Sequence, residues 1–397
     1  DGGEMEPVEL TVSTPEREAP RPEYAAHEAV ALQAAEEGIV LLKNEGGLLP
    51  LAEGAKLNLF GKSVWAFRCS ATGAGKINPR YTVDLTEALR LDPGVTANEE
   101  LLDFYRCLED RVPDDALLEG ARAFSELAIF VLTRTTGENV DNSTAPGEYS
   151  LSAEEEKLLG VLRERFPKLL VILNTGYPVA MGFVEKYKVD AVLYCGFGGM
   201  RGGEALLNVL LGRVSPCGRL PDTWVNDYAE LPTAANFYDA HVSGRHLDGN
   251  APQWLDTVYE EDIYLGYRYF SSFARPMAWP FGFGLSYTRF SLNAEQSGRE
   301  IAVTVTNTGS RAGKEVVQLY LQRPETERDK VKIELIDFAK TRELAPGESE
   351  TLRFSASDRQ LRIYNEEESA WIVEAGEYKL LVGPSCADMR EAGRIRV

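Results

Sequence analysis

The sequence contains little histidine and shows no spacing typical of a metal site. Among its 397 residues are three histidines and five scattered cysteines, with no Cys-x-x-Cys and no His-Glu-x-x-His. Because zinc sites are usually built on such spacings, we expect neither a metal nor another cofactor. We interpret the cysteines as buried free thiols in a reducing compartment. With no secretion signal in this piece, we expect a cytoplasmic location.

Basic residues and long apolar runs are also scarce. Lys and Arg total 42 against 62 Asp and Glu, which gives a formal charge of -20. Such a field repels polyphosphate and anionic lipid, so we expect no nucleic-acid partner. No apolar run approaches the roughly 18 residues of a membrane span, so we expect no membrane partner either.

The length and composition predict a folded protein with two or three domains. Apolar residues make up 44% and charged residues 26% of the chain. Both values are close to the averages for globular domains, which typically contain about 100 to 200 residues each. The chain begins at Asp1 without an initiator Met, and we therefore expect it to be a piece of a longer protein.

The first half of the chain predicts an α/β domain. Residues 1–22 are acidic and rich in proline, which is typical of an N-terminal surface arm. Residues 23–235 alternate helical patterns with short runs of Val, Ile and Leu, as in Lys56–Phe60, Leu127–Leu132 and Leu169–Leu173. Such runs predict a mostly parallel sheet that is covered by helices on both faces.

The second half predicts a connector and an all-β domain. Residues 236–290 are rich in glycine and aromatic residues and lack a clear period. Residues 291–397 alternate apolar and polar positions, as in Ile301–Thr306, between turn signals such as Asn307-Thr308-Gly309. This pattern predicts a small antiparallel sandwich of the immunoglobulin-like kind.

Two glycine-rich stretches invite a catalytic or binding interpretation. Cys195–Glu204 lies between a predicted strand and helix, where phosphate-binding turns occur, but it lacks Gly-x-Gly-x-x-Gly and Gly-Lys-[Ser/Thr]. We favour close packing of helix on strand, with a nucleotide-binding protein as an alternative. Gly282–Tyr287 lacks the Gly-x-Ser-x-Gly of a serine nucleophile, so we expect a tight turn there.

The stretch Thr133–Asn142 is the stronger candidate for a site. It leaves the carboxyl end of the predicted strand Leu127–Leu132, and ligands of open α/β sheets bind at that edge. Glu138 and Asp141 lie in this stretch, and Gly137 would allow a substrate to approach closely. By residue chemistry alone, a solvated loop explains both acids equally well.

Several segments resemble family-3 glycoside hydrolases, the β-glucosidase-type enzymes. The similarity spans residues from about 23 to 390, and its most specific part is the sixteen-residue segment Glu36–Leu51. Further similar segments are Gly218–Trp224, Gly266–Phe270, Trp279–Phe290 and Thr304–Gly309. The resemblance implies an α/β sandwich domain at 23–235, followed by a fibronectin type III-like domain at 291–397.

The family implies a retaining mechanism with two carboxylates. An Asp on a separate (β/α)8 barrel attacks the sugar, and a Glu on the second domain acts as acid and then base. Residues 134–142 are similar to the family's Arg-x-Ser-Gly-Glu-Gly-x-Asp-Arg, which gives Glu138 the acid/base role. Asn139 and Asn142 depart from this pattern, and without the Arg at 142 we expect Asp141 to lack its usual partner.

The same resemblance suggests residues that bind substrate. We expect Arg134, Asp141, Thr72, Asn78 and Tyr81 to line the rim and contact sugar hydroxyls. The loop Thr72–Tyr81 is similar to that of members whose barrel follows the β-sandwich. Four tryptophans could stack on sugar, but we expect core or connector packing for each: Trp65, Trp224, Trp254 and Trp279.

The sequence lacks a recognisable nucleophile. A (β/α)8 barrel needs about 250 residues, which the α/β region does not supply beyond its own sheet. We therefore expect the barrel elsewhere, in the same polypeptide or in another chain, and we expect this fragment to be inactive alone. The expected substrate is a β-linked glucoside or oligosaccharide. The alternative function is a non-catalytic carbohydrate-binding or scaffolding module. The sequence is also compatible with a homo-oligomer.

Overall fold

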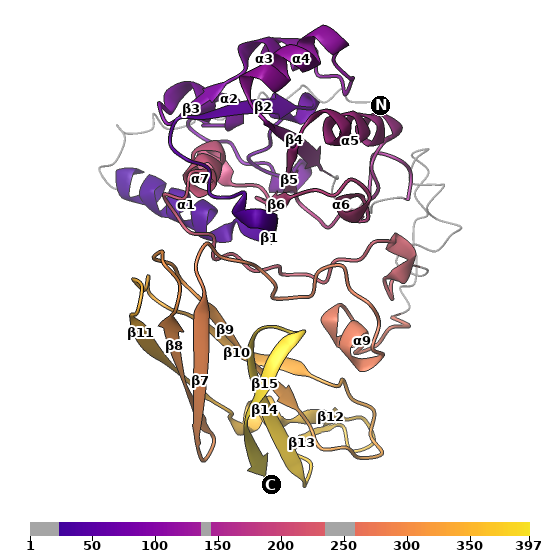
Figure 1. Cartoon of the computed structure of the whole chain (residues 1–397). Helices are drawn as coiled ribbons and strands as arrows, with labels where there is room; N and C mark the ends of the chain where they lie inside the picture. Colours follow the sequence, from indigo (N-terminus) through magenta and orange to yellow (C-terminus); the bar gives the residue numbers. More distant parts are fainter. Residues whose placement is uncertain (1–23, 136–143, 235–258) are drawn as a thin grey trace, which may run out of the picture.

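The computed structural model describes residues 24–135, 144–234 and 259–397. An α/β domain occupies the upper part of Figure 1 and a β-sandwich domain the lower part, with two stretches of chain running between them. The predicted arm at 1–22, Glu138, Asp141 and Trp254 lie outside the described residues.

The described part of the first domain contains a six-stranded sheet with the strand order β1-β6-β5-β4-β2-β3. Neighbouring strands from β6 to β3 are parallel, whereas β1 pairs with β6 in the antiparallel sense. The mostly parallel sheet is therefore confirmed. In sequence order the strands are β1 (Val40–Asn44), β2 (Ala55–Phe60), β3 (Val95–Ala97), β4 (Leu127–Arg134), β5 (Lys168–Thr175) and β6 (Ala191–Tyr194).

Helices cover both faces of this sheet. One apolar core joins the sheet to α1 (Tyr24–Gly38), α2 (Leu85–Leu91) and α7 (Gly202–Leu210). The core on the opposite face contains residues of α4 (Asp115–Phe124), α5 (Ala153–Arg165) and α6 (Phe183–Lys186), and α3 (Glu99–Tyr105) contributes to both. The central strands are buried on both sides, which explains their continuous apolar sequence.

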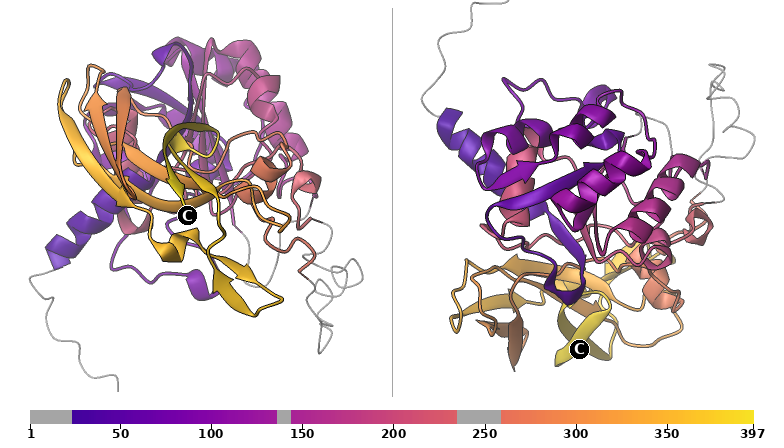
Figure 2. Two further views of the ribbon diagram at one scale, coloured as in Figure 1. Left: turned by 90° about the horizontal axis from the view of Figure 1, so that it is seen from below. Right: turned by 45° about the horizontal axis from the view of Figure 1, so that its top comes forward.

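Helix α1 has no fully buried residue, and it lies at the periphery in both views of Figure 2. Its apolar contacts come from partly buried side chains such as Leu32 and Ala35. The helix ends at Gly38, directly before β1.

The predicted strand Leu127–Leu132 is too short by two residues. Strand β4 pairs with β5 position by position as far as Arg134 opposite Thr175. Thr133 and Arg134 therefore belong to the sheet rather than to the loop that was expected to begin there. The cause is tertiary, because β5 supplies hydrogen-bonding partners to two polar residues that a sequence pattern assigns to a loop.

The connector covers the outer edge of strand β1. The backbone N–H of Leu285 donates to the carbonyl of Leu41 at 2.8 Å, and Trp279 Nε1 donates to the carbonyl of Leu42 at 3.1 Å. On its other side the same segment pairs with residues 218–224, including Leu220 N–H to the Phe283 carbonyl at 2.9 Å. The edge of β1, which would otherwise expose unpaired backbone groups, is thus covered by hydrogen bonding. The period-free sequence did not predict this paired structure.

The second domain consists of antiparallel sheets, as predicted. The larger sheets have the orders β10-β9-β14-β15 and β11-β8-β7, and β12 pairs with β13. Alternate residues of β8, such as Ile301, Val303 and Val305, are buried in the core between them. The strands are β7 (Phe290–Ser297), β8 (Glu300–Asn307), β9 (Val316–Gln322), β10 (Glu334–Lys340), β11 (Ser349–Ser355), β12 (Ile363–Asn365), β13 (Ala370–Ile372), β14 (Glu377–Ser385) and β15 (Asp388–Arg396). Helix α10 (Asp358–Leu361) belongs to this domain, whereas α9 (Tyr267–Ser272) belongs to the connector.

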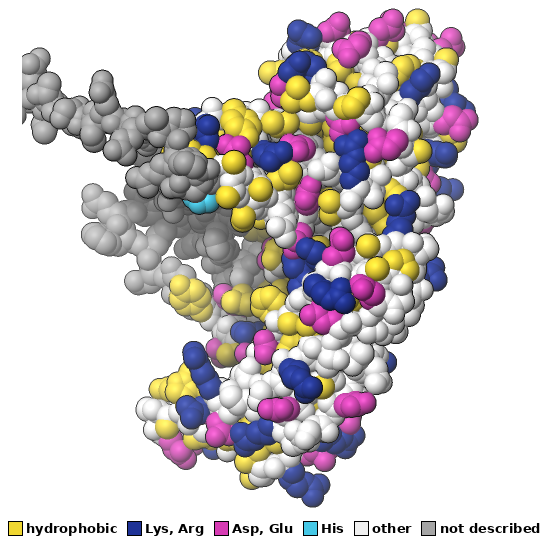
Figure 3. Space-filling model, turned by 90° about the vertical axis from the view of Figure 1, so that its left-hand side faces the viewer, with side chains coloured by type: hydrophobic (Ala, Val, Ile, Leu, Met, Phe, Trp, Pro, Cys, Tyr) yellow, Lys and Arg dark blue, Asp and Glu magenta, His cyan; other side chains and the backbone are white. Residues whose placement is uncertain are grey.

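Charges of both signs are interspersed on the face of the molecule that Figure 3 shows. Within the described residues, no helix is long and apolar enough to cross a membrane. All five cysteines are free thiols, and Cys195, Cys217 and Cys386 are buried as expected. Cys107 is exposed and Cys69 is partly exposed. The cytoplasmic location stays a prediction.

Ion pairs join the two domains. Glu37 at the end of α1 binds Lys314 at 2.6 Å and also binds Lys340, and its side chain is 14% exposed. Arg219 similarly binds Glu315. Burial alone would raise the pKa of Glu37, but hydrogen bonds from the two lysines outweigh it and lower the pKa to about 2.

We predict that Glu37 stabilises the protein in a pH-dependent way. Its folded pKa of about 2 lies below the ordinary 4.5, so its contribution is present above pH 4.5 and is lost as the pH falls toward 2. Replacement Glu37→Gln should lower the free energy of unfolding at pH 7 by about 1–2 kcal/mol. Urea unfolding at a series of pH values measures this. Glu119→Gln, at an exposed position of α4, is the control, and equal losses for both variants would contradict the prediction.

Candidate active site

The carboxyl ends of β2, β4, β5 and β6 lie at one edge of the sheet, because these strands are parallel. This is the edge where open α/β sheets bind ligands. The candidate residue Glu138 follows β4 in the sequence, and β4 ends at this edge. Glu138 and Asp141 lie outside the described residues, and the described residues nearest to them in the sequence are Thr135 and Thr144.

Arg134, the last residue of β4, uses all five of its N–H groups within the protein. Two form a bidentate pair with Glu155, from Nη1 to Oε1 at 2.8 Å and from Nη2 to Oε2 at 2.5 Å. The other three donate to backbone carbonyls: Nε to Glu148 at 3.0 Å, Nη1 to Thr133 at 3.1 Å and Nη2 to Ser150 at 3.4 Å. Arg134 is 7% exposed.

This arrangement does not support the expected contact between Arg134 and sugar hydroxyls. A guanidinium has five donors and no acceptor, and none of the five is left for a ligand. Arg134 instead ties the end of β4 to the segment 148–150, which returns toward α5. Its contacts are therefore those of a residue that fixes both flanks of the segment containing Glu138.

Glu155 combines two structural functions at the start of α5. Its Oε2 accepts from the backbone N–H of Ser152 at 2.8 Å, while Ser152 Oγ accepts from the Glu155 N–H at 3.2 Å. The two residues thus form a capping box at the start of the helix. The side chain is also 3% exposed and neutralises Arg134. Because the box fixes the carboxylate, it also fixes the guanidinium.

Asn174 organises the loops at this edge. It is fully buried, and its Oδ1 accepts from the Arg68 N–H at 2.6 Å and from Thr133 Oγ1 at 3.3 Å. Its Nδ2 donates to the carbonyls of Arg68 at 3.0 Å and Gly196 at 2.6 Å. All four hydrogen-bonding positions of the amide are occupied. One side chain thus joins β5 to the segments that follow β2 and β6.

The glycine-rich loop after β2 is attached to the opposite face of the sheet from α5. The hydroxyl of Tyr81 donates to Glu28 of α1 at 2.8 Å, and this hydrogen bond raises the pKa of Tyr81. Thr72 is partly exposed and Asn78 is exposed. The structure therefore anchors Tyr81 and Arg134 to different helices, and the expected sugar contacts of Thr72, Asn78 and Tyr81 stay predictions.

The other candidate stretches have packing functions. A Cβ at Gly203 would lie 2.1 Å from the carbonyl oxygen of Asp84, so the glycine permits close approach of the chain to α7. Burial raises the pKa of Cys195 at the start of this stretch to about 12. Trp224 is buried, and Trp65 Nε1 donates to the Leu102 carbonyl at 2.7 Å. These two tryptophans pack within the protein, as predicted, as does Trp279 through Leu42.

Sequence reasoning missed Asn174 and the pairing of Glu155 with Arg134. Both involve polar residues at the ends of buried strands, the same signal that singled out the region of Glu138. Asn174 directly follows the apolar run Leu169–Leu173. Glu155 and Arg134 are 21 residues apart, and such a pairing cannot be read from local spacing.

Two family models match the chain. The model of the glycosyl hydrolase family 3 C-terminal domain matches residues 39–267, which is more than half of the chain. The chain belongs to glycosyl hydrolase family 3. A fibronectin type III-like domain matches residues 315–386, which identifies the β-sandwich. The fold class and family expected from the sequence are thus confirmed.

Two relatives that match the chain are longer than it is. A β-glucosidase of Ruminococcus albus is 37% identical over 386 residues, which cover 90% of this chain and 39% of the relative. Thermostable β-glucosidase B of Acetivibrio thermocellus is 31% identical over 383 residues, which cover 94% of this chain and 48% of the relative. The family-3 chain thus spans less than half the length of these two relatives.

Solved structures show the same fold. The chain resembles a β-glucosidase from Paenibacillus barengoltzii with a TM-score of 0.83 and 31% identity, over 96% of this chain and 43% of that one. It also resembles β-glucosidase 3B from Thermotoga neapolitana, which was solved in complex with α-D-glucose. The TM-score is 0.82 and the identity 33%, over 95% of this chain and 56% of that one.

We predict that Arg134 and Glu155 are energetically coupled. Arg134→Met and Glu155→Gln should each lower the free energy of unfolding by about 3–5 kcal/mol, since each leaves a buried group without its ionic partner. The double variant should lose clearly less than the sum of the two. Urea unfolding of the original chain, the two single variants and the double variant measures this coupling. Arg122→Met, which breaks the exposed pair with Glu126, should cost less than about 1 kcal/mol, and additive losses at 134 and 155 would refute the coupling.

We also predict that Asn174 holds its neighbouring loops in place. Asn174→Leu keeps the side-chain size but removes the partners of partly buried backbone groups of Arg68 and Gly196, at a cost of about 1–3 kcal/mol. Hydrogen exchange at the Arg68 amide should accelerate, which mass spectrometry can detect. Asn293→Ala, at an exposed position of β7, serves as the control. Unchanged exchange at Arg68 would show that Asn174 does not hold this loop.

Proposed function

We propose that this chain is part of a retaining β-glycosidase of the β-glucosidase type. It supplies Glu138 as general acid and base, and an Asp nucleophile lies on a (β/α)8 barrel that is absent from this chain. The substrate is a β-linked glucoside or oligosaccharide. Membership of glycosyl hydrolase family 3, together with the names of the relatives, supports this proposal.

The observation that supports the role of Glu138 is the geometry of the described residues on either side of its segment in the sequence. Strand β4, which precedes this segment in the sequence, ends at the carboxyl edge of the parallel sheet, and Arg134 joins the end of β4 to residues 148–150. A carboxylate that transfers protons must be held in a fixed place relative to the glycosidic oxygen. We propose that Arg134, Glu155 and Asn174 act as positioning residues for this purpose.

The proposed chemistry has two steps. In the first, the barrel's Asp attacks the anomeric carbon while Glu138 gives its proton to the leaving oxygen, so that a covalent glycosyl ester forms. In the second, Glu138 takes a proton from water, and this water releases the sugar from the ester. The two carboxyl groups of a retaining enzyme lie about 5–5.5 Å apart, so the barrel must dock close to this edge.

Substrate contacts from the rim complete the proposal. Asp141, Thr72, Asn78 and Tyr81 are proposed to contact sugar hydroxyls, whereas Arg134 is proposed to position the loop. Since the nucleophile is provided by the barrel, the 397-residue chain alone is proposed to be inactive.

We predict that Glu138→Ala, in the protein joined to its barrel, separates substrates by leaving group. Hydrolysis of glucosides with poor leaving groups should fall by at least about 100-fold, because these oxygens need a proton as they depart. Activated aryl glucosides should be affected much less in the formation of the glycosyl ester. Pre-steady-state and steady-state rates with both substrate classes measure the difference.

The pH profile and a matched variant control this experiment. Loss of the acid should remove the alkaline limb of kcat/KM for the poor leaving groups. Glu154→Ala, at an exposed position of α5, should retain the normal rates. Equal loss on both substrate classes, with an unchanged pH profile, would contradict an acid role for Glu138.

A further inference from the structure

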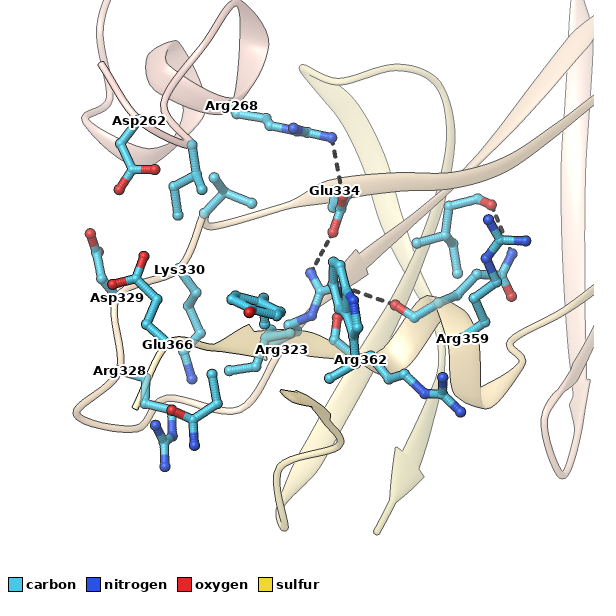
Figure 4. Close-up of a pocket in the computed structure, with 18 of the residues that line it drawn as sticks. Asp262, Arg268, Arg323, Arg328, Asp329, Lys330, Glu334, Arg359, Arg362 and Glu366 are labelled. Atoms are coloured by element: carbon cyan, nitrogen blue, oxygen red, sulfur yellow. Dashed lines mark hydrogen bonds and ion pairs between the residues drawn. The ribbon is translucent and has the colours of Figure 1, made fainter. Parts of the chain in front are cut away.

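A cavity of about 820 Å³ lies where the connector meets the β-sandwich. Its walls come from the connector near Asp262 and Arg268, from the segment between β9 and β10, and from α10 and β12 (Figure 4). This volume falls in the range of small-molecule sites in proteins, about 300–1,000 Å³. The cavity is therefore large enough for two or more sugar rings.

A buried guanidinium fixes the shape of this cavity. Arg323 is 8% exposed, and its Nη1 donates to Glu334 Oε2 at 2.6 Å. Its Nη2 donates to the carbonyls of Gln360 and Arg362, both at 3.0 Å. Glu334 also accepts from Arg268 of α9 at 3.1 Å, and both ion pairs are drawn in Figure 4. These bonds hold the connector, β10 and the α10–β12 segment together, so the cavity is pre-formed.

Two exposed aromatic rings lie at the cavity. Tyr364 and Trp371 are directly opposite each other on β12 and β13, with ring centroids 5.4 Å apart and planes at 65°. They are 51% and 64% exposed, and both line the cavity. Of the four tryptophans that the structure describes, Trp371 alone is exposed. The sequence patterns did not single out Trp371 as a residue that could stack on sugar.

The exposed rings have a physical use in this position. Their faces are apolar, and the C–H groups of one face of a pyranose ring pack well against them. A cross-strand aromatic pair also stabilises a short two-stranded sheet, by about 0.2–1 kcal/mol. That structural use does not require exposure of the rings at the wall of a cavity.

The charges of the wall indicate a neutral ligand. Six Lys and Arg side chains and five Asp and Glu side chains line the cavity, although the whole chain has a net charge of -20. A site for a phosphate or another strong anion would hold an excess of cations. Nearly balanced donors and acceptors instead match hydroxyl groups, each of which both donates and accepts.

We propose that this cavity binds a neutral β-linked oligosaccharide. One sugar ring packs against Tyr364 and Trp371, and the hydroxyl groups form hydrogen bonds with the charged side chains of the wall, such as Arg362. The β-linked glucose class rests on the proposed function. The presence of a sugar site rests on the cavity itself and does not depend on Glu138.

Isothermal titration calorimetry of the 397-residue chain with cellotetraose and laminaritetraose tests this proposal. We expect saturable binding of at least one oligosaccharide. Trp371→Val and Tyr364→Thr keep residues that favour strands while removing the rings, and each should weaken binding at least tenfold. Arg362→Met, outside the two-stranded sheet, should also weaken it. Thermal melting confirms that each variant is folded.

Phe338→Val provides the matched control. Phe338 on β10 is also 64% exposed but does not line the cavity, so this variant should bind like the original chain. Absence of saturable binding to both oligosaccharides would overturn the proposal. Undiminished binding by the folded Trp371, Tyr364 and Arg362 variants would do so too, as would displacement of the oligosaccharide by inorganic phosphate.

The measurement is independent of the test of Glu138. It detects binding by this chain without any turnover, whereas the acid/base role is tested by hydrolysis in the protein joined to its barrel. A negative result at the cavity would therefore leave the role of Glu138 standing, and failure of the Glu138 prediction would leave the cavity's binding standing.

Discussion

The buried guanidinium of Arg134 needs a partner for each of its five N–H groups, and this requirement shapes the candidate site. Removing a charge from water is costly unless it is paired and hydrogen-bonded. Glu155 supplies the opposite charge, and three carbonyls supply the remaining acceptors. The end of β4, the segment before α5 and the first turn of α5 therefore adopt one joint arrangement. Asn174 extends the same principle to the loops after β2 and β6.

Pairing of a different kind unites the two domains. The segment 279–285 lies between β1 and residues 218–224, so that it continues the hydrogen-bonding pattern at the sheet edge. Glu37 and Arg219 add ion pairs to the β-sandwich across this junction. A cavity that spans the connector and the β-sandwich can keep its shape only if both parts are held together. The same contacts link the edge of the α/β domain to the part of the molecule that contains the proposed sugar site.

The sequence predicted the parts of the fold that depend on local pattern. Continuous apolar runs such as Leu169–Leu173 indicated buried parallel strands, and alternation as in Ile301–Thr306 indicated the sandwich. The similar segments identified the family, which the family models confirm. Patterns of this kind record which faces of a strand or helix are buried, and burial leaves a periodic signal. The connector has no such period, and its paired structure was not predicted.

By itself, the sequence determined the fold class, the family and the stretch in which the proposed acid Glu138 lies. Only the tertiary structure decided what Arg134 contacts, that Asn174 joins β5 to the loops after β2 and β6, and that Trp371 is exposed at a cavity. Each of these depends on partners far away in the chain, and no local spacing encodes them. An arginine beside a candidate site is equally suited to bind a sugar or a buried carboxylate. The choice is made by the groups that folding places within reach of its five donors.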